Sequence, residues 1–133
     1  MTLSISIFTF IPPLADLATD THVFHPGWMP HARVHTVWLL GLTSSIGLLA
    51  LYFLWVRKVD SYFNVNLAGT LGVTVYGSFF LSSLTAGLYG GSLSDHGGGI
   101  EQSILGFDLN VFTFGLALMG LGAGWGLYKW AGK

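Results

Sequence analysis

Four apolar runs, each close to the length that crosses a bilayer, occupy most of this chain and constrain its fold most strongly. They cover roughly residues 3–18, 34–56, 67–89 and 109–130. A helix of about 20 residues spans the roughly 30 Å hydrocarbon core of a bilayer. Only 8% of the residues are charged, against about 25% in soluble domains. The sequence therefore predicts an all-α, polytopic membrane protein: a four-transmembrane-helix bundle that forms a single domain over residues 1–133.

The first run is the shortest and holds the pair Pro12-Pro13. Two prolines remove two backbone donors and should kink the helix, which neighbouring helices can tolerate inside a membrane. Met1 to Ala18 contains no Lys or Arg, unlike the basic start of a signal peptide. We therefore expect an uncleaved first span.

Composition also limits the partners. The net charge is −1 and no basic patch is present, so nucleic acid is not an expected partner. The chain has no cysteine, which excludes disulfides, thiolate metal sites and thiol nucleophiles. The expected surroundings are the lipid bilayer.

The distribution of charge predicts how the bundle is oriented. Four spans place both termini and the second connection on one side, which collects Arg57, Lys58, Lys129 and Lys133. The positive-inside rule makes this side cytoplasmic, so the prediction is N-in and C-in. The opposite, non-cytoplasmic side then receives all five histidines and five of the six acidic residues. They are Asp16, Asp20, His22, His25, His31, His35, Asp95, His96, Glu101 and Asp108.

Ionisable groups near the membrane are functional candidates, although side chains of the headgroup zone can also be solvated and inert. An Asp–His pair at an apolar pocket could move protons in an isomerisation, cyclisation or hydrolysis of a lipid-soluble small molecule. The candidates for this acid–base chemistry are His31, His35, Asp16 and Asp20. The candidates for ligand binding are Trp28, Trp38, Asp95 and His96. His31, His35 and Trp38 would share one helix face, with Arg33 pointing elsewhere.

A metal site is a second interpretation. His31 and His35 have the i, i+4 spacing at which one helix face offers two imidazoles, and His22 and His25 add two further nitrogen ligands. Zinc or copper would suit these ligands. The HExxH signature is absent because residue 32 is alanine. Haem is not expected, because no span carries a histidine at mid-depth.

A third interpretation is a non-catalytic small subunit or assembly factor of a larger membrane complex. The stripe Thr70, Thr74, Ser78 and Ser82 and the spaced pairs Gly120/Gly124 and Gly122/Gly126 suit close helix contacts. The same stripes can serve packing within the bundle alone. Transport is not expected, because no charged residue lies at mid-depth in any span.

Residues 21–35, THVFHPGWMPHARVH, resemble a T-H-x-F-N-P-x-W-P-P-H-A-R-F-H segment of uncharacterised small four-span integral membrane proteins. In that family the segment lies between the first two spans. Here His25, Met29 and Val34 replace Asn, Pro and Phe. The resemblance implies the four-span layout and no particular activity. The layout is also similar in architecture, without a shared motif, to the sterol-isomerase and sigma-2-receptor group, which would imply sterol-like or prenyl-like ligands.

Overall fold

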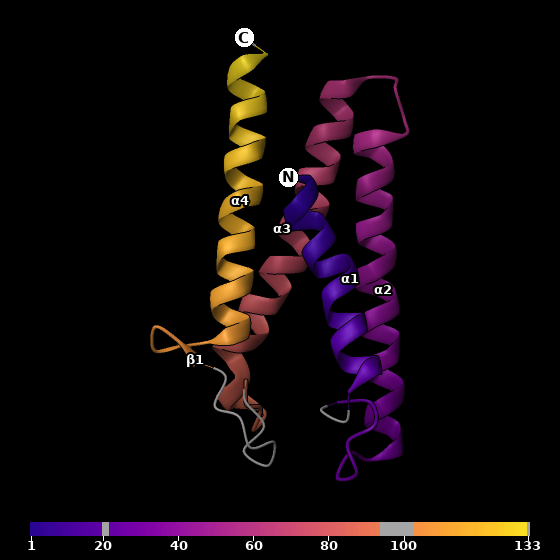
Figure 1. Ribbon diagram of the computed structural model, residues 1–133, viewed down its shortest axis with the longest axis vertical. Coiled ribbons are helices and arrows are strands. Elements are labelled where there is room, and N and C mark those ends of the chain that lie inside the picture. Colours follow the sequence, from indigo (N-terminus) through magenta and orange to yellow (C-terminus); the bar gives the residue numbers. More distant parts are fainter. Residues whose placement is uncertain (20–21, 94–102, 133) are drawn as a thin grey trace.

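Four helices dominate the computed structural model, which describes residues 1–19, 22–93 and 103–132. They are α1 (Thr2–Ala18), α2 (Pro30–Trp55), α3 (Ser61–Thr85) and α4 (Leu109–Ala131) (Figure 1). A 3-10 turn, η1 (Ala86–Leu88), extends α3. The helices Pro30–Trp55, Ser61–Leu88 and Leu109–Ala131 are long and apolar enough to cross a membrane, whereas α1 is shorter. The predicted helical fold is therefore confirmed.

One of the predicted element ends needs correction. Pro30 is the first residue of α2, as expected, but α3 begins at Ser61 rather than near residue 67. Asp60 adopts a left-handed backbone (φ 51°) and its side chain accepts a hydrogen bond from the Phe63 amide. This N-cap satisfies one of the free amides of the first turn. The polar stretch 59–66, which the sequence predicts as a loop between the second and third spans, therefore mostly forms the first turns of α3.

A short hairpin before α4 was not predicted. Its strands are β1 (Ser103–Ile104) and β2 (Phe107–Asp108), with Gly106 at φ 81° in the turn. Asp108 then caps α4, because its Oδ1 accepts from the amides of Asn110 (2.8 Å) and Val111 (3.3 Å). Asp108, one of the acids grouped on the non-cytoplasmic side, is thus explained by helix capping.

The helices run alternately up and down. α1 contacts all three other helices, α3 contacts α2 and α4, and α2 does not contact α4. The end of α2 and the start of α1 are joined by a hydrogen bond from Trp55 Nε1 to Thr2 Oγ1 (3.1 Å). Residues 22–29, before α2, and the hairpin before α4 lie toward the other end of the molecule (Figure 1).

Most of the buried side chains form one layer, which we call the packed layer. Tyr76 lies at its centre, fully buried, with its ring edge-to-face against Phe8 (5.4 Å between centroids) and against Phe114 (5.6 Å). Its hydroxyl donates to the Ser4 carbonyl, which ties α3 to α1. The other buried members are Ile5, Thr9, Gly47, Ala50, Ala68, Gly69, Gly72, Ala117 and Leu121.

Glycines bring the helices together in this layer. A Cβ built on Gly47 would lie 1.9 Å from Thr9 Oγ1, and one on Gly72 would lie 2.8 Å from Leu121 Cδ2. A Cβ built on Gly124 would lie 2.7 Å from the Met1 nitrogen. Small residues therefore let side chains of α1 pack against α2 and a side chain of α4 pack against α3, and they let the start of α1 approach α4 closely.

The predicted roles of the small-residue stripes are only partly right. Thr70, Thr74, Ser78 and Ser82 are all exposed, so they do not make the close contacts of α3. Gly120 and Gly124 face α1, as expected for internal packing. No described atom lies within 4 Å of the Cβ positions of Gly122 and Gly126.

The helix α1 continues through Pro12-Pro13. Pro13 has no amide hydrogen, so the Thr9 carbonyl lacks its usual donor four residues along. Ser44 of α2 replaces that donor, because its hydroxyl donates to the Thr9 carbonyl at 2.9 Å. A side chain of the neighbouring helix thus satisfies the acceptor that the proline leaves free.

Candidate functional site

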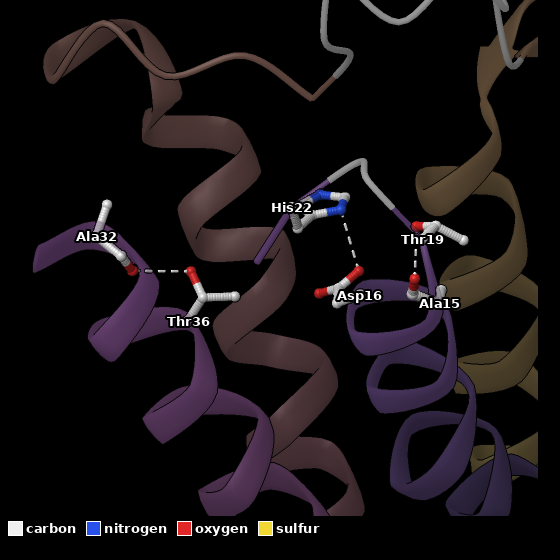
Figure 2. Close-up of polar contacts among 6 residues, drawn as sticks. All are labelled: Ala15, Asp16, Thr19, His22, Ala32 and Thr36. Carbon is white, nitrogen blue, oxygen red and sulfur yellow. Dashed lines mark hydrogen bonds and ion pairs between the residues drawn. The ribbon is translucent and has the colours of Figure 1, made fainter. Parts of the chain in front are cut away.

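Asp16 lies in the last turn of α1, and its carboxylate pairs with an imidazole of the following connection. His22 Nδ1 is 3.1 Å from Asp16 Oδ1 (Figure 2). The Asp16 side chain is 17% exposed and that of His22 is 48% exposed. The pair therefore joins a largely covered carboxylate to an imidazole that water can reach. An Asp–His contact of this kind can exchange a proton between its two members.

Local hydrogen bonds shape the connection that carries His22. The amides of His25 and Trp28 donate to the carbonyls of His22 (3.0 Å) and His25 (3.1 Å), which makes two successive turns. Arg33 of α2 donates from Nη2 to the His25 carbonyl (3.0 Å) and so ties the connection to the bundle. The Trp28 ring packs edge-on against the His22 ring, 5.7 Å between centroids.

Asp16 also lines a cavity of about 340 Å³ between the helices, which we call the Asp16 cavity. Its lining is mainly apolar, with polar atoms from one carboxylate and three hydroxyls. The apolar lining consists of Phe8, Pro12, Leu39, Leu40, Val75, Phe79 and Phe114, and the polar lining of Asp16, Thr43, Ser78 and Ser82. Concave, mostly apolar sites with a few polar groups are typical of small-molecule binding.

The Asp16 cavity has a closed floor and an open rim. Phe8 and Leu40 are buried, at 1% and 7% exposure, whereas Leu39, Ser78 and Ser82 are exposed. The exposed residues belong to α2 and α3. A molecule would therefore enter from the side of the bundle, between these two helices, rather than along the helix axes.

The structure does not bring His31 and His35 to Asp16. The two imidazoles contact each other, with 3.0 Å between their Nε2 atoms, and the His35 ring lies 6.0 Å from that of Trp38. The predicted shared face therefore exists. All three side chains are exposed, however, while Leu40, Gly47 and Ala50 make the buried side of α2. The face that we assigned to acid–base chemistry points away from the bundle.

The histidines proposed as metal ligands separate in the same way. His22 pairs with Asp16, and His25 Nδ1 accepts from the Gly27 amide (3.2 Å). His31 and His35 offer two nitrogens to one point: bonds of about 2.0–2.1 Å to a metal would meet at roughly 95° across their 3.0 Å separation. Among the described residues, no three His, Asp or Glu side chains gather at one place.

Several predicted residues lie outside the described part of the chain. These are Asp20, proposed for acid–base chemistry, Asp95 and His96, proposed for ligand binding, and Glu101. Trp28 lies beside the Asp16–His22 pair but does not line the Asp16 cavity, and Trp38 lies on the outward face of α2.

Sequence reasoning missed most of the cavity lining. Ser78 and Ser82 carried a usable signal, because their regular spacing marked a polar stripe, which we interpreted as a helix contact. Pro12 was noted only as a kink. Thr43 and Phe114 carried no signal, since single residues of these types are common in apolar helices.

A larger cavity, of about 580 Å³, lies between the start of α3 and the last turns of α4. Tyr62, Tyr128, Lys129, Ala131 and Gly132 line it. Tyr62 is 66% exposed, and Lys129 stacks over the Trp125 ring at 4.7 Å. The described lining of this cavity includes neither a buried residue nor an acidic group, so the Asp16 cavity is the better candidate site.

No protein-family model, curated protein or solved structure matches this chain.

Proposed function

We propose that this chain is an integral membrane protein that binds a lipid-soluble small molecule in the Asp16 cavity. One observation carries the proposal: a carboxylate lines a mainly apolar cavity between apolar helices. A carboxylate in such surroundings is expensive to keep and marks functional sites. The Asp16–His22 pair would supply the acid–base group if the bound molecule also reacts.

The proposed orientation has four spans, with both termini cytoplasmic and the cavity toward the non-cytoplasmic leaflet. The connection between α2 and α3 carries Arg57 and Lys58, and the last turn of α4 carries Lys129, which supports this orientation by the positive-inside rule. In such a bilayer the exposed rim on α2 and α3 faces acyl chains. Lateral entry then suits a ligand that is already dissolved in the membrane.

Ligand retention tests the proposal. The protein is purified in lipid nanodiscs and its bound small molecules are extracted and identified by mass spectrometry. Ser78→Phe places a ring in the Asp16 cavity and should remove the bound molecule. Ser45→Phe is the matched control, because Ser45 is an exposed serine of α2 that, like Ser78, donates to its own helix. Equal retention by both variants, or no molecule above empty nanodiscs, would contradict the proposal.

Single cysteines test the orientation, since the chain has none of its own. Lys58→Cys marks the connection between α2 and α3, and Leu105→Cys marks the hairpin before α4. In intact cells a membrane-impermeant maleimide should label Leu105→Cys and should label Lys58→Cys only after permeabilisation. Labelling of both positions, or the reverse pattern, would refute the proposed orientation.

The alternative is a non-catalytic subunit of a larger membrane complex. The outward faces of Gly122 and Gly126 favour it, because the described chain places nothing against them. Purification in mild detergent decides between the two proposals. A subunit should retain other membrane chains in Ser78→Phe and lose them in Gly122→Leu. A ligand-binding protein should instead lose its bound small molecule in Ser78→Phe and keep it in Gly122→Leu.

A further inference from the structure

The polar groups of the Asp16 cavity determine which hydrogen bonds it can offer a ligand. Besides the Asp16 carboxylate, the described lining has three hydroxyls, those of Thr43, Ser78 and Ser82. An ionised carboxylate only accepts hydrogen bonds, whereas a hydroxyl can both donate and accept. What the cavity offers a ligand therefore depends on where the three hydroxyl hydrogens already go.

All three hydroxyls donate to carbonyls of their own helices. Thr43 Oγ1 is 2.9 Å from the Leu39 carbonyl oxygen. Ser78 Oγ is 2.8 Å from that of Thr74, and Ser82 Oγ is 2.9 Å from that of Phe79. This back-bonding is common for Ser and Thr within helices. It commits each hydroxyl hydrogen and leaves the oxygen lone pairs for a ligand.

The proline on the cavity wall adds no donor. Pro12 has no amide hydrogen, so the Phe8 carbonyl lacks its α-helical partner. Phe8 and Pro12 both line the cavity. The remaining described lining consists of aliphatic and aromatic side chains.

We infer that the Asp16 cavity selects molecules whose polar end donates hydrogen bonds, namely lipid-soluble alcohols or amines. It discriminates against molecules whose polar end only accepts, such as ketones and quinones, and against carboxylate anions. This inference rests on the proposed function. The committed hydroxyls and the carboxylate carry it, because together they present acceptors and no free donor.

The size of the discrimination follows from what each ligand would disturb. A ketone must either go unpaired or take a hydrogen from an existing helix bond, which weakens binding roughly 2- to 10-fold for each such bond. An alcohol or an ammonium group instead donates to the carboxylate, a charged acceptor that strengthens the bond further. We expect at least about a tenfold preference for donors.

Four probes of equal chain length test the inference: decanol, decylamine, methyl octyl ketone and decanoate. Binding to the full-length protein in nanodiscs is measured by native mass spectrometry and corrected for uptake into empty nanodiscs. The wild type should bind decanol and decylamine at least about tenfold more tightly than the ketone or decanoate. A preference for decylamine over decanol identifies an ammonium ligand, and equal affinity identifies a hydroxyl ligand.

Asp16→Asn gives the sharpest variant, because the carboxamide supplies donors while keeping the shape. The ketone should then bind nearly as well as decanol, and any advantage of decylamine should disappear. Ser78→Ala combined with Ser82→Ala provides a second route if Asp16→Asn does not fold. That double variant should weaken decanol binding without improving ketone binding.

A pair of neighbouring serines gives a matched control. Ser82 and Ser83 both donate to the Phe79 carbonyl, at 2.9 and 2.8 Å, but only Ser82 lines the cavity. Ser82→Ala should weaken decanol binding roughly 2- to 10-fold and Ser83→Ala should leave it unchanged. Equal binding of the ketone and decanol to the wild type would overturn this inference alone. Failure of all four probes to bind would overturn the proposed function, and this inference with it.

Discussion

The packed layer and the Asp16 cavity are built from similar residues used in opposite ways. In the packed layer the Tyr76 hydroxyl bonds across to α1, the Thr9 hydroxyl bonds within α1, and glycines such as Gly47 leave room for side chains of the neighbouring helix. Around the cavity, the hydroxyls of Ser78 and Ser82 bond to their own helix and leave space between helices. The difference teaches that a hydroxyl bond across helices, as at Tyr76, makes a structural contact. A bond back to the same helix leaves the hydroxyl oxygen available to a ligand only where a cavity adjoins it, as at Ser78 and Ser82 but not at Thr9.

A substitution that disturbs the close helix contacts of the packed layer should have the largest effect on the free energy of unfolding. Gly47→Ala adds a methyl group 1.9 Å from Thr9 Oγ1, and such overpacking typically destabilises by about 1–3 kcal/mol. Gly77→Ala is the control, because no described atom lies within 4 Å of its Cβ position, and alanine there should stabilise the helix by up to about 1 kcal/mol. Unfolding in detergent measures both. Equal effects would mean that the layer is not closely packed.

Removing a hydroxyl that bonds across helices should have the next largest effect on the free energy of unfolding. Tyr76→Phe keeps the ring contacts with Phe8 and Phe114 and removes the bond to the Ser4 carbonyl, which should cost about 1–1.5 kcal/mol of unfolding free energy. Ser78→Ala removes a hydroxyl that bonds only within its helix and should be nearly neutral. A larger loss for Ser78→Ala than for Tyr76→Phe would reverse the comparison.

The bond from Ser44 to Thr9 allows a sharper test, because it exists to replace a donor that Pro13 lacks. Ser44→Ala should destabilise by about 0.5–1 kcal/mol. In a Pro13→Ala background the residue 13 amide can bond the Thr9 carbonyl, so the same change should have little effect. A double-mutant cycle on unfolding free energies measures this coupling. Strictly additive effects on the unfolding free energy would show that Ser44 does not replace the donor that Pro13 lacks.

The sequence predicted the helices of this fold much better than its candidate site. Length and lack of charge were enough to indicate four helices, and Pro30 marked where α2 begins. The sequence did not predict which face of a helix points into the bundle. Helical spacing showed that His31, His35 and Trp38 share a face, but α2 is apolar all round: exposed Leu42 and Leu49 resemble buried Leu40. With no amphipathic contrast, spacing alone does not show which face points inward.

The polar residues were misassigned for a related physical reason. A serine or threonine in an apolar helix can bond across to a neighbour, as Ser44 does, or back to its own carbonyls, as Ser78 does. Both arrangements satisfy the hydroxyl, so residue type does not distinguish them. The partner of Asp16 was equally hidden, because the turns from His22 to Trp28 decide which imidazole folds back over α1.

The smallest expected effect concerns the Asp16–His22 pair itself. His22 is 48% exposed, and exposed ion pairs contribute about 0–1 kcal/mol. His22→Gln should therefore change the unfolding free energy by less than about 1 kcal/mol, like the control His35→Gln on the outward face of α2. If the pair belongs to a ligand site rather than to the packing, His22→Gln should still alter binding of decylamine to the Asp16 cavity, whereas His35→Gln should not. A destabilisation above about 2 kcal/mol, well beyond an exposed pair, would place Asp16 with the packed layer and remove the contrast between the two regions.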